Sequence, residues 1–165
     1  MPAQTIRRAR EDDWDGARAL WREVDDLHAS LAPAYFREAA RALAEWRELL
    51  GAADAAVFVA EAEAETTSRA PPSGVVGIVS VRIYETPPDP AMVPRRRGHV
   101  EMLVVSVAHR RRGVGARLME EVATWARRQG AAELVLTVWA GNRAAEAFYE
   151  RLGYRALSRV LHAKL

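Results

Sequence analysis

A run of arginines and glycines in the second half of the chain has the composition of an anion-binding loop. The run is Arg110-Arg111-Arg112-Gly113-Val114-Gly115, and an amphipathic segment with helical periodicity follows it directly. Glycines let a ligand approach the backbone closely because they carry no Cβ. The N–H groups at a helix start and the three guanidinium groups favour negative charge there. We therefore expect a phosphate or pyrophosphate to bind here, although a basic turn that only caps a core helix has the same composition.

Two common phosphate-binding motifs do not fit this loop. A Walker loop requires a lysine after its last glycine, and the single lysine of the chain is Lys164. The Rossmann fingerprint requires a third glycine at the position that Leu118 occupies. The phosphate of a nucleoside triphosphate or of NAD is therefore not the expected ligand.

The segment before the loop, His99 to Val105, predicts a mostly buried strand with an acidic residue inside it. Strict alternation puts two sets of side chains on opposite faces, namely His99, Glu101, Leu103 and Val105 on one and Val100, Met102 and Val104 on the other. Glu101 is then a carboxylate among apolar neighbours, which suits a general base working near neutrality. A glutamate that only forms a salt bridge with an arginine at the strand edge is the alternative.

A second polar motif begins at Asn142, after an apolar stretch from Glu133 to Trp139 that predicts a strand. Asn142 is a suitable N-cap for a helix whose inner face carries Ala145, Phe148 and Leu152. The order of elements predicts a strand–helix–strand crossover and a parallel pair of strands.

The two motifs resemble the signatures of the GNAT acetyltransferase superfamily. Arg110, Gly113 and Gly115 fill its pattern Arg/Gln-x-x-Gly-x-Gly/Ala, and the segment from Asn142 to Tyr154 fills Asn-x-x-Ala-x-x-Phe-Tyr-x-x-x-Gly-Tyr/Phe. The resemblance covers residues 99–154 well, whereas residues 1–98 agree in pattern only. One departure is Ser106-Val107, which stands where family members often have Asp-Pro.

The resemblance implies a site for acetyl-CoA, with the pyrophosphate on the loop amides and the pantetheine arm along the preceding strand. In the family the asparagine contacts that arm, and the tyrosine donates a proton to the thiolate, although Tyr149 as a plain core aromatic is the alternative. The implied cofactor-binding residues are Leu103, Val104, Val105, Arg110, Arg111, Arg112, Gly113, Val114, Gly115, Ala116 and Asn142. The implied catalytic groups are Glu101 as base, Tyr149 as acid and the backbone N–H of Val105, which meets the oxyanion.

The expected fold is α/β of the α+β type, a GNAT-like three-layer fold over residues 1–165 as a single domain. A mixed, mostly antiparallel central sheet is splayed between two parallel strands, with helices on both faces. The expected function is transfer of acetyl from acetyl-CoA to a primary amine of a small molecule or peptide by direct attack in a ternary complex. A non-catalytic acyl-CoA-binding or regulatory module is the alternative, and the presence of both Glu101 and Tyr149 argues against it.

The first half of the chain predicts the remaining elements of this fold. Expected strands are Gln4–Ala9, Ala55–Ala60 and Gly74–Tyr84, the last two joined by a polar connection. A helix from Asp12 buries Trp14, Ala17, Trp21, Val24 and His28, and a second helix ending at Gly51 buries Phe36, Ala39, Leu43, Trp46 and Leu50. Asp25, Asp26, His28 and Tyr35 gather where these helices meet, as an acceptor entrance or as ordinary polar helix ends. Arg95-Arg96-Arg97 follow a proline-rich connection, either attracting an acidic acceptor or forming a solvated cluster.

Composition excludes several other classes of protein. A net charge of +2 is low for a nucleic-acid binder, so we expect no nucleic-acid partner. The chain has no cysteine, which excludes an acetyl-cysteine intermediate, and its four histidines show no HExxH pairing, so no metal is expected. The sequence has neither a signal-peptide core nor an apolar run of about 20 residues, so we expect a cytoplasmic protein without a membrane partner. The oligomeric state stays open, a homodimer included.

Overall fold

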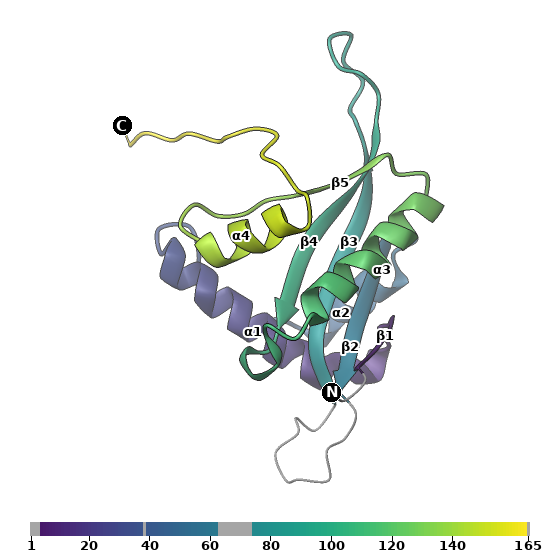
Figure 1. Cartoon of the computed structure of the whole chain (residues 1–165), viewed down its shortest axis with the longest axis vertical. Coiled ribbons are helices and arrows are strands. Elements are labelled where there is room, and N and C mark those ends of the chain that lie inside the picture. The colour runs from purple at the N-terminus through teal and green to yellow at the C-terminus, as the bar shows by residue number, and fades with distance from the viewer. Residues whose placement is uncertain (1–3, 38, 63–73, 165) are drawn as a thin grey trace.

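Five strands form one sheet in the order β1-β2-β3-β4-β5, so strands that follow each other in the chain are neighbours in space (Figure 1). The computed structural model describes residues 4–37, 39–62 and 74–164. The strands are β1 (Gln4–Arg8), β2 (Ala55–Ala62), β3 (Val75–Glu85), β4 (Arg96–Val105) and β5 (Glu133–Leu136). Three neighbouring pairs are antiparallel and the β4–β5 pair is parallel. The expected mixed, mostly antiparallel sheet is confirmed.

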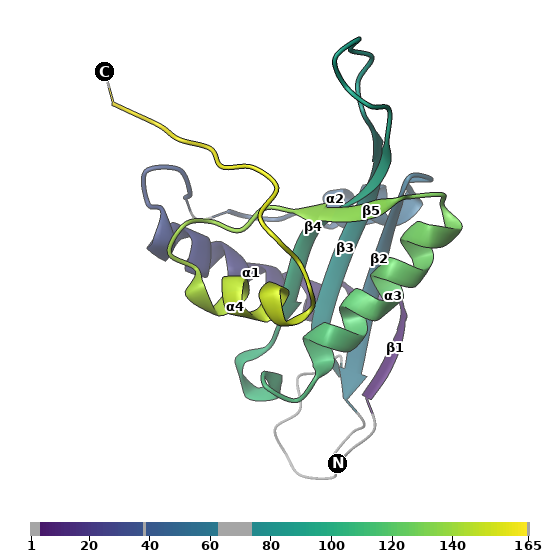
Figure 2. The same ribbon diagram turned by 45° about the horizontal axis from the view of Figure 1, so that its top comes forward.

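Helices cover both faces of this sheet and give the three expected layers (Figure 2). The helices are α1 (Trp14–Leu31), α2 (Leu43–Gly51), α3 (Val114–Arg128) and α4 (Arg143–Arg151). Helices α1 and α2 pack on one face, and α3 and α4 lie on the other. Two short 3-10 turns, η1 (Glu11–Asp13) and η2 (Val107–His109), precede α1 and α3. None of the helices in the described ranges is long and apolar enough to cross a membrane.

Each face of the sheet has its own apolar core because the central strands are buried on both sides. Residues Ala55–Ala60 of β2 are all buried, which explains their continuous apolar run. Under α1 and α2 the rings of Trp14, Trp21 and Trp46 lie 5.6–6.4 Å apart between centroids. Under α3 the core includes Leu118 and Val122, which lie one helical turn apart on its apolar face. Gly130 follows the end of α3 with a positive φ of 78°, which suits a glycine.

The loop between α1 and α2 is longer than the sequence predicts. Helix α1 continues to Leu31 because its end is set by Pro33, which keeps the preceding Ala32 out of the helical conformation (φ −142°, ψ 66°). The second helix begins only at Leu43, so the prediction that Phe36 and Ala39 lie on its inner face is wrong. The Phe36 ring instead packs on His28 and Trp139, with centroids 4.8 and 4.7 Å away. These aromatic contacts hold the loop in place of helical hydrogen bonds.

The predicted strand–helix–strand crossover at the end of the chain also differs from the structure. Strand β5 ends at Leu136 rather than Trp139, and residues 154–164 form no strand. This final segment leads away from the sheet (Figure 2) and leaves Leu157, Val160 and Leu161 exposed. The polar connection expected between β2 and β3 lies mostly outside the described residues.

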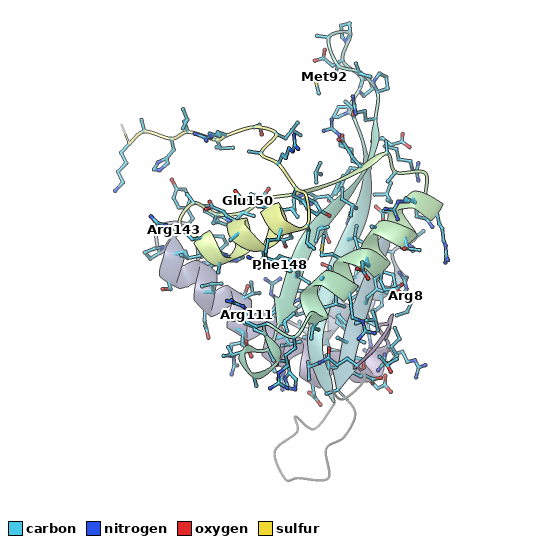
Figure 3. All side chains as sticks on the ribbon, in the orientation of Figure 1. Arg8, Met92, Arg111, Arg143, Phe148 and Glu150 are labelled. Carbon is cyan, nitrogen blue, oxygen red and sulfur yellow. The ribbon has the colours of Figure 1, made fainter. Side chains whose placement is uncertain are left out.

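The connection between β3 and β4 stands out from the body of the protein, with Met92 near its tip (Figure 3). Thr86 and Arg95 close its base, because Thr86 N–H donates to the Arg95 carbonyl at 2.8 Å and Arg95 N–H donates to Thr86 Oγ1 at 3.1 Å. Its four prolines account for the absence of regular structure beyond that base.

Candidate active site

Strands β4 and β5 separate along their length and leave a gap at one end of the sheet. Their parallel pairing stops where Val100 faces Leu136. Strand β4 then continues to Val105, whereas β5 has already ended. One edge of the second half of β4 is therefore uncovered by a strand within the described part of the chain.

Backbone groups of β4 point into this gap. The Ser106 N–H donates to the carbonyl of Val76 on β3 at 2.9 Å. Because successive residues of an antiparallel strand face opposite edges, the backbone N–H groups of Val105 and Leu103 face the edge away from β3. The Val104 N–H faces β3, so only two of the three backbone positions predicted to bind the ligand are aimed at the gap.

Glu101 is the extra residue of a β-bulge in β4. Met102 pairs with Ser80 and Val100 pairs with Val81, so Glu101 has no counterpart on β3. A bulge of this kind re-aims a side chain and interrupts the regular alternation of faces. The bulge divides each predicted set, because Val100 packs on the α3 side whereas Met102 and Val104 pack on the α1 side. The predicted common face of His99, Glu101, Leu103 and Val105 is therefore wrong.

The surroundings of Glu101 are more polar than the sequence suggests. Its carboxylate accepts hydrogen bonds from Arg82 Nε at 3.2 Å and from the Tyr84 hydroxyl at 3.4 Å, and 30% of the side chain is exposed. Arg82 also donates to Asp54 at 2.8 Å. The expected apolar environment is wrong, and the salt bridge to an arginine is present.

A pocket of about 440 Å³ opens beside Glu101 on the α1 face of the sheet. Its wall comes from the end of α1, the loop after it, β4 and the segment after β5, and includes Asp25, His28, Tyr35, Phe36, Arg41, Glu101 and Trp139. Three of the four residues expected at an acceptor entrance line the pocket, and Asp26 does not. Phe36 and Trp139 were missed because their helical and strand periodicity assigned both to the core.

The arginines before β4 do not line this pocket. Arg97 and Arg95 lie 2.7 and 3.9 Å from the Glu133 carboxylate, and Arg96 lies 2.6 Å from the Glu85 carboxylate. These contacts tie the start of β4 to its two neighbouring strands. The interpretation of Arg95-Arg96-Arg97 as an acceptor-attracting cluster gains no support from their positions.

The arginine–glycine loop connects the open edge of β4 to the start of α3. Arg110 donates through Nε to the Val105 carbonyl at 2.9 Å and approaches Glu23 of α1 at 3.4 Å, so it fixes the loop to the strand and to α1. Arg111 and Gly113 both adopt left-handed backbone conformations, with φ of 63° and 81°. In the described structure no side chain caps α3, so its first N–H groups are available to an anion.

The two glycines of the loop, Gly113 and Gly115, are needed for different structural reasons. A Cβ added to Gly113 meets no atom within 4 Å, so its glycine is required by the positive φ. A Cβ added to Gly115 would lie 3.1 Å from the Phe148 ring of α4, which is tighter than ordinary packing. Gly115 therefore lets α4 pack on the start of α3, whereas the sequence suggested only close approach of a ligand. Figure 3 shows Phe148 on α4 beside this helix end.

The turn before the loop holds together without the Asp-Pro pair. Ser106 Oγ lies 2.8 Å from His109 Nδ1, and the His109 N–H donates to the Ser106 carbonyl at 2.9 Å. The departure from the family pattern is thus accommodated by a local hydrogen-bonded turn.

Tyr149 lies on α4 beside two other aromatic rings, with centroids 5.0 Å from Phe148 and 5.6 Å from Tyr154. Burial, with a smaller contribution from Tyr154, raises the pKa of Tyr149 to about 12. The phenol therefore keeps its proton at neutral pH. Asn142 caps α4, since its Oδ1 accepts the Ala145 N–H at 3.2 Å, which leaves its amide NH₂ to serve a ligand.

Comparison with known families finds one whose model matches most of the chain. Residues 18–154 match the model of the acetyltransferase (GNAT) family. The chain is 34% identical over 64 residues to N-alpha-acetyltransferase 30 of Schizosaccharomyces pombe. That match covers 39% of this chain and 43% of the yeast protein, so it spans less than half of the curated relative.

Solved structures with a similar fold cover nearly the whole chain. A mutant of the BH1408 protein from Bacillus halodurans has a TM-score of 0.86 at 20% identity, with 98% of this chain and 99% of that chain covered. Aminoglycoside 6'-N-acetyltransferase AAC(6')-Ih from Acinetobacter baumannii has a TM-score of 0.72 at 19% identity, with 99% and 98% covered. Aminoglycoside N-acetyltransferase AAC(6')-Iy in complex with CoA has a TM-score of 0.70 at 19% identity, with 98% of each chain covered. At these identities the similarity shows the shared fold.

Proposed function

Because this chain belongs to the GNAT acetyltransferase family, we propose that it transfers the acetyl group of acetyl-CoA to a primary amine by direct attack in a ternary complex. The gap beside β4 is the observation that carries the proposal. The gap has an uncapped helix start and arginines at one end and a pocket with a carboxylate at the other. The proposal treats residues 1–165 as one acetyltransferase domain, which is supported by two cores that share one sheet.

In this proposal the loop binds the pyrophosphate of acetyl-CoA. The first N–H groups of α3, from Gly113 to Ala116, and the side chains of Arg111 and Arg112 supply donors and positive charge. Arg110 shapes the loop through its hydrogen bonds to the Val105 carbonyl and to Glu23. Its positive charge offsets the phosphate charge without direct contact with the ligand.

The pantetheine arm lies along the open edge of β4. The N–H of Leu103 faces the gap and is suited to an amide carbonyl of the arm, while the Asn142 NH₂ donates to the same arm from the opposite side. Val104 contributes packing rather than a backbone hydrogen bond, because its N–H faces β3. The thioester is then placed next to the Val105 N–H.

The acceptor amine approaches from the pocket and loses a proton to Glu101, directly or through one water. Its lone pair attacks the acetyl carbonyl and forms the C–N bond, and the oxyanion is stabilised by the Val105 N–H. The C–S bond then breaks, the CoA thiolate takes the proton of Tyr149, and the nitrogen gives up its second proton, which returns through solvent to the phenolate and leaves a neutral amide. With a pKa of about 12, the Tyr149 phenol carries its proton when the thiolate forms, as a general acid must.

Two substitutions test these roles while acetyl-CoA turnover is followed by thiol release. Tyr149→Phe keeps the ring and Glu101→Gln keeps the shape, so both should bind acetyl-CoA almost normally and lose about 10²–10⁴-fold in turnover. The Glu101→Gln variant should recover rate as rising pH deprotonates the amine without help. Tyr154→Phe is the matched control, since it removes a neighbouring hydroxyl and should retain activity.

The same measurements separate the enzyme from a non-catalytic acyl-CoA-binding module. For the enzyme, CoA should raise the melting temperature, ATP should not, and an amine should release thiol from acetyl-CoA. Stabilisation by CoA with no turnover of any amine would favour the binding module. Full activity in both the Tyr149 and Glu101 variants would refute the assigned acid and base.

A further inference from the structure

Part of the wall of the pocket that Glu101 lines is built from aromatic rings that come from three separate segments. His28 stands at the end of α1, Tyr35 and Phe36 in the following loop, and Trp139 after β5. The Phe36 ring stacks on His28 at 4.8 Å and forms a T-shaped pair with Trp139 at 4.7 Å, and Tyr35 lies 5.5 Å from Trp139. Such a contiguous ring surface is suited to a flat apolar group.

This wall provides little negative charge to a ligand. The Asp25 carboxylate is held by two hydrogen bonds from Arg41, at 2.9 and 3.1 Å, and only 13% of its side chain is exposed. Burial lowers the pKa of His28, so its imidazole is neutral at pH 7. Arg37 also lines the pocket and adds positive charge. Glu101 also accepts a hydrogen bond from Arg82, at 3.2 Å, but 30% of its side chain is exposed, so it is the more accessible carboxylate for an ammonium group in the described pocket.

From this arrangement we infer that the acceptor is an arylalkylamine, a molecule with one primary amine joined by a short chain to an aromatic ring. The ring lies on Phe36 and Trp139 while the amine reaches Glu101. A polyamine or an aminoglycoside has several ammonium groups, and each would need a carboxylate that this pocket does not offer. A volume of about 440 Å³ accommodates such a small molecule. The inference rests on the proposed function, because it assigns the second substrate of the same site.

The first test compares acceptors by kcat/KM in the thiol-release assay with acetyl-CoA. Phenethylamine and tryptamine should exceed n-butylamine about tenfold or more, because the aliphatic amine lacks a ring, and should exceed spermidine and kanamycin further. A higher kcat/KM for spermidine, for kanamycin or for a short peptide without aromatic residues would overturn the inference while leaving the acetyltransferase proposal intact.

The second test removes the rings one at a time. Phe36→Leu and Trp139→Leu should raise KM for phenethylamine about threefold to tenfold, and kcat/KM for n-butylamine should change less than twofold. Met92→Leu, in the connection that stands away from the body, is the control and should change neither value. An equal loss for both amines would show that the rings only support the fold and would overturn the inference.

Binding of phenethylamine to the complex of the enzyme with CoA, measured by calorimetry, distinguishes the two proposals. Binding without turnover of any amine supports the arylalkylamine site and refutes the catalytic proposal. Absence of both binding and turnover of phenethylamine, while another amine is acetylated, refutes the arylalkylamine site alone.

Discussion

Arg111 is held in a left-handed backbone conformation in the middle of the loop that we propose to bind the pyrophosphate. Among the described residues it is the only non-glycine with a positive φ. Such a conformation costs on the order of 1–3 kcal/mol in a residue with a Cβ. The cost is consistent with a loop that is shaped before its ligand arrives, with the Arg111 side chain directed by the strained backbone.

Replacing Arg111 by glycine should stabilise the protein and weaken CoA binding at the same time. Glycine adopts the positive φ without strain, so the free energy of unfolding in urea should rise by about 1 kcal/mol. The lost charge should raise the Kd for CoA severalfold. Arg112→Gly is the matched control, because it removes the same charge at a residue without a positive φ and should weaken binding without stabilising the fold. A destabilised Arg111→Gly protein would contradict the strain argument.

The residues of this loop were predictable from the sequence, but their individual contacts were not. Glycine and arginine types at a strand–helix junction indicate an anion site because that preference is local. The bond from Arg110 to Val105 and the packing of Phe148 on Gly115 depend on which segments meet in the folded chain. Sequence spacing therefore indicated where the loop is, and only the structure shows that Gly115 also serves the contact between α3 and α4.

At the scale of the element, the bulge in β4 is the feature that gives Glu101 its direction. On either side of Glu101 the strand is paired with β3 in a regular register, and Val100 and Met102 face the two opposite cores. In a regular strand without Glu101, Val100 and Met102 would be neighbours and would also face opposite sides, so each would keep the core that it packs against now. The bulge is therefore a local insertion that leaves the packing of its flanks unchanged.

Deletion of Glu101 should accordingly leave a folded protein without activity. The ladder between β3 and β4 closes into one regular register, so the free energy of unfolding should stay within about 1 kcal/mol of the wild type. Turnover should fall about 10²–10⁴-fold, as in Glu101→Gln, which keeps the bulge and serves as the comparison. Circular dichroism with urea titration and the thiol-release assay measure the two effects. Loss of the folded state on deletion would show that the bulge is needed for the sheet itself.

Sequence periodicity succeeded for regular elements and failed where the backbone departs from regularity. The predictions for β1 and α3 agree closely with the structure, because an edge strand and an amphipathic helix are recognisable locally. A bulge adds one residue to a strand without changing the residue types around it. Strict alternation therefore placed Leu103 on the same face as His99, whereas in the structure Leu103 packs against the core under α3. Phe36 continued a helical pattern of apolar residues, yet its ring is used in a pocket rather than in the core.

At the scale of the whole molecule, a charged cluster joins three elements at the opposite edge of the sheet. Arg7 of β1 donates to both carboxylate oxygens of Asp13 at 2.8 Å and also binds Glu61 of β2. The Asp13 side chain is 5% exposed and also accepts the Arg10 N–H at 2.7 Å. Burial opposes ionisation of Asp13, but these hydrogen bonds outweigh it and lower its pKa. The hydrogen bond from Arg7 likewise lowers the pKa of Glu61.

This cluster should make the protein sensitive to acid in a defined direction. A carboxylate whose folded pKa is lowered stabilises the fold above its unfolded pKa of about 4, and that contribution is lost as pH falls through the folded value. Asp13→Asn should lower the free energy of unfolding at pH 7 by about 1–3 kcal/mol and reduce its dependence on pH below about 4. Urea titrations from pH 7 to pH 3 measure both effects, and kcat at pH 7 should stay unchanged in the folded variant. An unchanged pH dependence would show that Asp13 does not control acid unfolding.

The connection between β3 and β4 also makes this protein convenient for site-specific labelling. The natural chain contains no cysteine, so Met92→Cys would create a single thiol. Met92 is 47% exposed near the tip of that connection, well away from the labelled Arg111 in Figure 3. A maleimide dye attached there would have one possible position on every molecule and would leave both ligand sites uncovered. Fluorescence anisotropy or surface attachment would then be available without redesign of the rest of the chain.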